Sequence, residues 1–202
     1  MVLKRVGYGQ VEPNQLSAQK TGQIYASLPL NKDVNVLQNG EFMYYDYSTK
    51  TVTAEPDVAV GEPMLVFNEI KLYEPFWRTS YKDFAMIRVG ENYVTSKLAT
   101  AGYGEGSENY VTVSIEHTEY PYRMEGFAPR MFKTNVGDVM TTNMVKADVD
   151  YVEGDLLTPV LNAESKTMVL EKTYKTEGML WVVGKAYTMP DGQPGLKLQR
   201  VQ

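Results

Sequence analysis

Short runs of β-branched and aromatic residues, each closed by turn-forming residues, recur along most of this chain. Runs of this kind, spaced at intervals of about 8–12 residues, are typical of strands that meet in an antiparallel sandwich or barrel. No window of 12 residues carries a convincing apolar stripe at helical spacing. We therefore predict an all-β fold of short antiparallel strands. Periodicity alone leaves sandwich and barrel as open alternatives.

The candidate strands fall in one β domain over residues 24–202. Asn39-Gly40 predicts a hairpin, because both residues accept positive φ, and Pro190-Asp191-Gly192-Gln193-Pro194 predicts a turn before the last strand. The predicted strands are Ile24–Leu28, Val34–Leu37, Phe42–Tyr47, Thr51–Thr53, Met64–Tyr73, Phe84–Val89, Tyr93–Leu98, Tyr110–His117, Met131–Thr134, Val139–Thr142, Leu156–Leu161, Thr167–Leu170, Leu180–Val183 and Leu196–Val201.

One short pattern, glycine followed by an acid, any residue and an apolar residue, occurs four times. It begins at Gly40, Gly61, Gly137 and Gly154. We interpret it as a tight turn that feeds a strand, in which glycine supplies the backbone angle and the acid accepts hydrogen bonds from turn amides. Convergent turn chemistry in an all-β chain explains the repetition better than an internal repeat does.

Residues 1–23 differ from the rest, being polar and interrupted by glycine. Leu16–Lys20 suits one helical turn ended by Gly22, but the segment has no pattern long enough for a core element. We predict an extended N-terminal arm, held by a neighbouring subunit or folded back on its own domain.

The amino-acid composition excludes several classes of function. The net charge is −5 with no block of like charge, which argues against binding to a nucleic-acid backbone. There is no cysteine and one histidine, so thiol nucleophiles, thiolate metal sites and most histidine-based catalysis are excluded. Apolar runs are far shorter than a membrane helix, and the start lacks the apolar stretch of a signal peptide. We expect a soluble, cytoplasmically made, non-enzymatic protein with no cofactor and no catalytic or metal site.

Three features of the sequence resemble chemical sites. His117 shares the apolar face of an alternating strand and is interpreted as structural. Gly102–Ser107 lacks the lysine and hydroxyl pair of a phosphate loop and is interpreted as a contact loop. The acids from Asp148 to Asp155 deviate from the spacing of an EF-hand, so a solvated acidic turn is favoured over a calcium site.

The aromatic residues are mostly tyrosine, 15 against 6 phenylalanines. Tyrosine has an apolar ring and a polar tip, which suit both protein interfaces and sugar-stacking platforms, although strands of any β protein also carry tyrosine. The clusters are Tyr44, Tyr45 and Tyr47; Tyr73, Phe76, Trp77 and Tyr81; and Tyr120 and Tyr122.

Four segments resemble virion structural proteins of tailed bacteriophages. They are Val11–Ala26, Met64–Tyr73 with Tyr81–Ala85, Phe132–Asn143 and Met189–Gln199. The resemblance implies a head-associated protein, either a capsid decoration (cement) protein or the base of a head fibre, on the capsid exterior. The implied partners are the major capsid protein and further copies of the chain, in a trimer or another symmetric homo-oligomer, without membrane or direct nucleic-acid contact.

On this hypothesis the arm lies along an adjacent subunit, with its basic residues on an acidic surface and its apolar residues in notches. The predicted partner contacts are Leu3, Lys4, Arg5, Val6, Tyr8, Gln10, Phe76, Trp77 and Tyr81. The main alternative is a carbohydrate-binding or receptor-binding module of a virion, in which Trp77, Phe76 and nearby tyrosines stack on sugar rings. A β-fold hydrolase is a third, weaker hypothesis.

Overall fold

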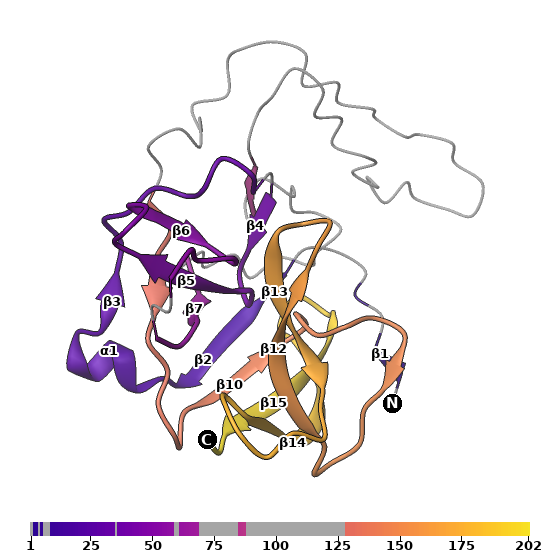
Figure 1. Ribbon diagram of the computed structural model, residues 1–202. Coiled ribbons are helices and arrows are strands. Elements are labelled where there is room, and N and C mark those ends of the chain that lie inside the picture. Colours follow the sequence, from indigo (N-terminus) through magenta and orange to yellow (C-terminus); the bar gives the residue numbers. More distant parts are fainter. Residues whose placement is uncertain are drawn as a thin grey trace.

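The computed structural model describes residues 2–3, 5, 9–34, 36–58, 61–68, 85–87 and 128–202. It confirms the predicted all-β class: strands pair antiparallel and one short helix accompanies them (Figure 1). The elements are β1 (Val2–Leu3), β2 (Val11–Gln15), α1 (Ser17–Thr21), β3 (Ile24–Tyr25), β4 (Val36–Gln38), β5 (Phe42–Asp46), β6 (Thr51–Thr53), β7 (Met64–Val66), β8 (Ala85–Ile87), β9 (Met131–Phe132), β10 (Val139–Thr142), β11 (Val149–Asp150), β12 (Leu156–Asn162), β13 (Thr167–Lys172), β14 (Trp181–Thr188) and β15 (Pro194–Arg200).

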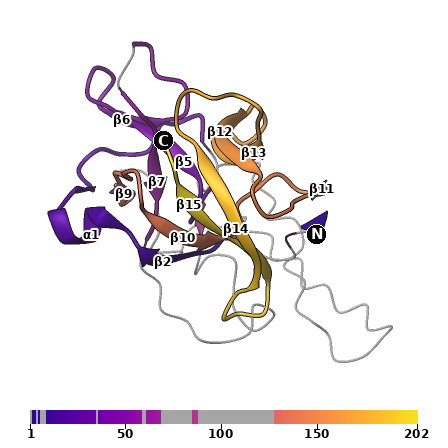
Figure 2. The ribbon, with the colours of Figure 1, turned by 90° about the horizontal axis from the view of Figure 1, so that it is seen from below.

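Most of these strands belong to one curled sheet (Figures 1 and 2). Its order among the described residues is β2-β10-β15-β14-β12-β13-β5-β7-β9-β3, with β6 paired to β5. The first and last strands of this order, β2 and β3, are joined in sequence by α1. The helix therefore spans the gap between the two sheet edges, and the sheet curls into a partly closed barrel.

The core fills the inside of this curl. Phe42, Phe132, Met140 and Trp181 are fully buried, and the rings of Phe42 and Trp181 lie 6.1 Å apart in a tilted arrangement. Met168 on β13 faces Phe42 on β5, a single residue pair at which the two halves of the sheet meet. Side-chain packing, more than backbone pairing, therefore holds these halves together.

The prediction of an extended arm over residues 1–23 is not confirmed. β2 pairs with β10, so Val139 faces Gln15 and Thr142 faces Val11. β2 is polar because it is an edge strand with Asn14 and Gln15 exposed, and an edge strand tolerates Pro13, which lacks an N–H. The predicted helical turn is confirmed as α1, and it ends at Gly22 with φ 69°.

Asp138 fixes α1 to the barrel. One carboxylate oxygen accepts a hydrogen bond from the backbone N–H of Ser17 at 2.9 Å, and the other accepts from the Ser17 hydroxyl and from the backbone N–H of Asn135. Asn135 in turn donates to the Ser17 hydroxyl at 2.7 Å. The carboxylate thus accepts a hydrogen bond from an otherwise unpaired amide of the first helical turn and another from an amide of the turn before β10.

The glycine–acid pattern forms the same turn three times. At Gly40, Gly137 and Gly154, φ lies between 90° and 95°. The following acid, Glu41, Asp138 or Asp155, accepts a side-chain hydrogen bond from the backbone N–H three residues earlier. In each case one residue of another segment closes the turn with two backbone hydrogen bonds: its carbonyl oxygen accepts from the glycine N–H, and its N–H donates to the backbone carbonyl of the acidic residue. These residues are Val66, Arg200 and Val183. The predicted turn chemistry is confirmed at these three glycines. Gly61 also has a positive φ, of 92°, but the residue three before Glu62 lies outside the described residues.

The predicted Asn39-Gly40 hairpin is wrong in its pairing. The positive φ is confined to Gly40, and the strands on either side, β4 and β5, pair with β8 and with β6, β7 and β13. The turn therefore directs the chain from one sheet to another. The predicted turn at Pro190–Pro194 does close a hairpin, β14–β15, and Ser48-Thr49-Lys50 closes another, β5–β6. The strands predicted at Tyr93–Leu98 and Tyr110–His117 lie outside the described residues.

Two glycine substitutions should separate backbone strain from steric clash. The Cβ of an alanine at Gly137 would meet no atom within 4 Å, so the only cost is the strain of the positive φ. We expect a loss of about 1–2 kcal/mol in unfolding free energy. Alanine at Gly40 bears the same φ, and its Cβ would lie 2.6 Å from the Thr142 hydroxyl, so we expect a loss at least about twice as large. Urea denaturation of the two variants measures both losses. Equal losses would contradict the turn packing described here.

Candidate interaction surface

Exposed apolar side chains gather at one end of the barrel. Among the described residues, seven large hydrophobic side chains are exposed. Four of them lie just before β10 or β12 or just after β13 or β15, and the strand register brings these strand ends together at one end of the sheet. They are Val136 (67% exposed), Val152 (53%), Tyr174 (94%) and Val201 (43%). We call this surface the turn end; it is the lower end of the molecule in Figure 1. Four such side chains at one end of a domain indicate an interaction surface more strongly than four scattered ones do.

Backbone hydrogen bonds connect the segments that carry these four residues. The N–H of Gly137 donates to the Arg200 carbonyl at 2.8 Å, and the Val201 N–H donates to the Leu180 carbonyl at 2.9 Å. The N–H of Gly154 donates to the Val183 carbonyl, and the Thr173 N–H donates to the Leu156 carbonyl, both at 2.8 Å. Val136 and Val152 themselves belong to two of the repeated turns. The backbone that carries these side chains is therefore part of the hydrogen-bonded sheet.

The buried side chain of Arg200 strengthens this end. Its guanidinium donates to both carboxylate oxygens of Glu62, at 2.7 and 2.6 Å, and to the carbonyl and hydroxyl oxygens of Thr134. A guanidinium that engages a carboxylate and a neighbouring segment together fixes their relative positions. The last strand is thereby tied to the segment before β7 and to the segment before β10.

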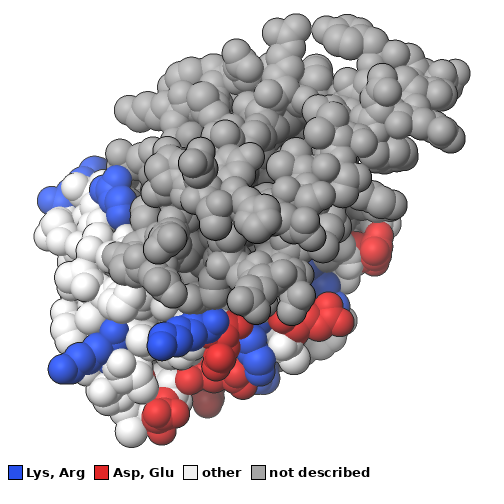
Figure 3. Space-filling model, turned by 90° about the horizontal axis from the view of Figure 1, so that it is seen from above, with Lys and Arg blue, Asp and Glu red and all other residues white. Residues whose placement is uncertain are grey.

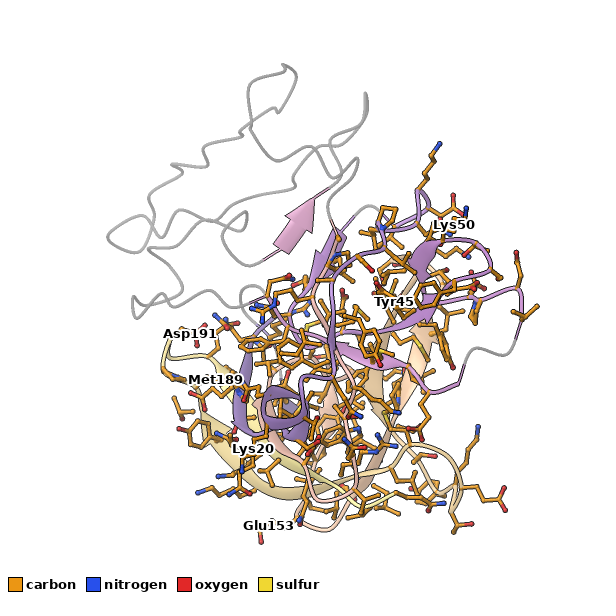
Figure 4. The ribbon with its side chains drawn as sticks, turned by 90° about the vertical axis from the view of Figure 1, so that its left-hand side faces the viewer. Lys20, Tyr45, Lys50, Glu153, Met189 and Asp191 are labelled. Atoms are coloured by element: carbon orange, nitrogen blue, oxygen red, sulfur yellow. The ribbon has the colours of Figure 1, made fainter. Side chains whose placement is uncertain are left out.

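Charged side chains are exposed at both ends of the barrel. At the turn end, Glu153, Lys175 and Glu177 are exposed around the apolar side chains, and Figure 4 shows Glu153 at this end and Lys50 at the other. The opposite end, viewed in Figure 3, presents Lys and Arg side chains beside Asp and Glu where it is described. Pairs such as Lys166 with Glu55, at 3.0 Å, and Lys146 with Glu171, at 2.8 Å, contribute little to stability because they are exposed.

Glu41 is the carboxyl group with the most perturbed environment. Burial raises its pKa from 4.5 to about 7, against hydrogen bonds from the Gln38 N–H and the Thr167 hydroxyl and the positive charge of Arg5, all of which lower it. A carboxyl group of this kind can act as an acid or base in catalysis. Here both oxygens are occupied by groups of the fold and the side chain is only 2% exposed, so we assign Glu41 a structural role.

The acids between Asp148 and Asp155 do not converge on a common point. Asp155 accepts from the Val152 N–H and pairs with Lys172 at 2.7 Å, and these interactions hold its pKa below the usual range although burial acts in the opposite direction. Asp150 is exposed opposite Val2. Among the described residues, no group of three or more histidine, cysteine or acidic side chains is arranged to hold a metal ion.

The structure describes three of the predicted partner contacts. Leu3 is fully buried in the chain's own core, Arg5 is half-buried and donates to the sulfur of Met144, and the backbone of Gln10 bonds to Asn143 and Thr142. These residues come together on their own domain. The other predicted contacts and sites lie outside the described residues: Lys4, Val6, Tyr8, Phe76, Trp77, Tyr81, His117 and 102–107.

Tyr45 and Tyr47, two of the three tyrosines of one predicted cluster, form a row of rings with Tyr25 of β3. Tyr25 and Tyr45 have ring centroids 5.3 Å apart, and Tyr45 and Tyr47 have theirs 5.2 Å apart. The Tyr45 hydroxyl lies 2.6 Å from the Ser27 hydroxyl and accepts from the Ser27 N–H, which holds this ring inside the body (Figure 4). Tyr47 remains exposed at the outer end of the row.

The four residues of the turn end were not among the predicted contacts. Val136 and Val152 belong to segments that the glycine–acid pattern predicts as turns, and an apolar residue at an exposed turn position is the signal that would have marked them. Tyr174 and Val201 offer no such signal, since nothing in the sequence places the β13–β14 connection beside the C-terminus.

Comparisons with protein-family models, with curated proteins and with solved structures found no match to this chain. In the part of the chain that the structure describes, no helix has the length and apolar character needed to cross a membrane.

The buried carboxyl of Glu41 should make stability depend on pH. Below pH about 4.5 the group is protonated in both folded and unfolded chains and has no effect. Between pH 4.5 and 7 the unfolded chain releases this proton while the folded chain keeps it, so the unfolding free energy falls as pH rises, by up to about 3 kcal/mol. Above pH 7 the contribution is constant.

Glu41→Gln should remove this fall, because the amide can accept from the Gln38 N–H and donate to the Thr167 hydroxyl without ionising. Urea denaturation between pH 4.5 and 8 compares the two proteins. If their stabilities change in parallel over this range, Glu41 is not the group responsible.

Proposed function

We propose that this chain is a non-enzymatic structural protein of a tailed-bacteriophage virion that binds the exterior of the capsid shell and stabilises it. The observation that carries the proposal is the turn end, an exposed apolar surface on hydrogen-bonded turns. The resemblance of four segments to phage virion proteins supplies the class of partner. The major capsid protein is then the surface on which the turn end docks, and the same contact is repeated at each symmetry-related position.

The energetics of such a contact suit a repeated assembly. A valine or tyrosine side chain that passes from water into an interface contributes about 1–3 kcal/mol. A turn end that is rigid before binding loses little conformational entropy on docking. Because many copies act on one shell, each contact can be moderate while the shell as a whole gains considerable stability.

Docking through the turn end predicts a specific loss of binding. In Val136→Thr/Tyr174→Ser the apolar surface is reduced, and we expect affinity for emptied phage heads to fall about tenfold or more. Co-sedimentation of the purified chain with emptied heads measures this. The unaltered chain should saturate at a copy number related to the capsid symmetry.

Tyr47→Ser is the matched control, since it removes an exposed tyrosine from the opposite end and should leave head binding unchanged. Saturable binding that both variants retain would keep the capsid role and move the contact elsewhere. Absence of saturable binding by the unaltered chain would refute the capsid role.

A second candidate, a carbohydrate-binding or receptor-binding module of the virion, is favoured by the row of Tyr25, Tyr45 and Tyr47. Its outer ring is exposed, and aromatic rings of this kind stack on sugars. A glycan array with the unaltered chain and Tyr47→Ser tests it: binding to a defined glycan, lost in the variant, would support this function.

A further inference from the structure

We call residues 1–5 the N-terminal tip; two of its described residues pair with β11, an edge that carries acidic residues. Val2 and Leu3 of β1 face Asp150 and Val149 of β11 in an antiparallel pair. The Asp148 N–H donates to the Leu3 carbonyl at 3.3 Å, and the Leu3 side chain is fully buried. In the described part of the chain, β1 is the sole strand partner of β11.

The tip and this edge carry opposite charge. The tip contains Lys4 and Arg5 and no acid, whereas the edge has Asp148 and Asp150, with Glu153 shortly after. Asp148 and Asp150 are both exposed. The acids that suggested a calcium loop in the sequence therefore lie beside Val2 and Leu3 of the tip, while Arg5 of the tip donates to the sulfur of Met144.

The chain is firmly anchored a few residues beyond the tip. The Gly9 N–H donates to the Gln38 side-chain oxygen and the Gln10 N–H to the Asn143 side-chain oxygen, both at 2.7 Å. Asn143 then donates to Gln193, which donates to Asp191 in the β14–β15 hairpin. Any Cβ on Gly9 would lie 2.5 Å from the Asn39 carbonyl oxygen, which shows how closely this segment is packed.

Among its described residues, the tip is held by the β1–β11 pair, by the buried Leu3 side chain and by the hydrogen bond from Arg5 to the sulfur of Met144. A pair of two-residue strands with one buried leucine can open at a small fraction of the cost of unfolding the barrel. From the anchor at Gly9, the six residue steps to Leu3 reach at most about 20 Å. An opened tip can therefore search a limited volume around its own barrel.

We propose that the β11 edge also receives the tip of a second copy of this chain, so that neighbouring copies exchange their N-terminal residues. The exchanged contacts are the same as those within one chain, so their energies are similar, and the choice between them depends on the effective concentration of the neighbour. A dilute chain keeps its tip on its own edge. Copies crowded within about 20 Å of one another exchange it.

This inference rests on the proposed function, because a capsid surface is what would crowd the copies. It also gives the acidic surface expected to receive Lys4 and Arg5 a definite location, which is the β11 edge of the adjacent copy.

A cysteine-free chain allows a direct test. Val2→Cys and Asp150→Cys are made as two separate single variants, mixed in equal amounts and oxidised at about 1 mM, the effective concentration of a short flexible linker. The two positions face each other in the β1–β11 pair. A disulfide between them can form only between chains, so we expect a covalent dimer on a non-reducing gel, well above the background of each variant alone.

Thr158→Cys mixed with Glu171→Cys is the matched control. These positions face each other in the β12–β13 hairpin, which cannot exchange without unfolding the barrel, so the mixture should give background dimer only. A Val2→Cys/Asp150→Cys mixture that does no better than this control at 1 mM would overturn the proposal.

The same mixture bound to emptied heads separates the two proposals. More dimer on heads than in dilute solution supports exchange between neighbours on the shell. Binding to heads without any dimer refutes exchange and leaves the capsid role intact. Dimer in concentrated solution without head binding supports exchange and refutes the capsid role.

Discussion

The turn in which a glycine at φ near +90° precedes an acid is the constraint on which the rest of this structure depends. Each of its three copies satisfies its own amide with the acid side chain and offers two backbone groups to another segment. A turn built this way links the two elements beside it in sequence to a third element that is distant in sequence. Through Val66, Arg200 and Val183, the turns bring β7, β15 and β14 into place, and the curl of the sheet follows from these links.

Burial of polar groups follows from this construction. Glu41, Asp138, Asn143 and Gln193 are nearly or fully buried, and each has hydrogen-bond partners. Within the described part, the indole nitrogen of Trp181 is the buried side-chain polar atom that has none. Satisfied polar networks hold a single arrangement of the chain, because any other arrangement leaves groups unpaired at a cost of about 1–3 kcal/mol each. One consequence is the raised pKa of Glu41, which lowers the stability of the fold as pH rises.

The proposed capsid role and the proposed exchange of N-terminal tips use opposite physical properties of one domain. The turn end is apolar, exposed and fixed by backbone hydrogen bonds, so it suits docking on a surface that is already formed. The described residues of the tip pair with β11 at two positions and lie close to a firm anchor at Gly9, so the tip suits exchange. A protein with both properties would bind a shell through one surface and link its copies through another.

The sequence by itself determined the all-β class, the location of most of the described strands and the chemistry of the glycine–acid turns at Gly40, Gly137 and Gly154, because side-chain alternation and positive φ are local properties. It also located α1, whose end at Gly22 is a local signal. The tertiary structure alone decided that polar β2 joins the main sheet, that Asn39-Gly40 turns between sheets, and that Tyr174 and Val201 share a surface with Val136. Each of these depends on which distant segment supplies the partner for a backbone group, and pairing across the chain leaves no local pattern. The turns could therefore be predicted from the local sequence, and the surface formed by the segments that they connect could not.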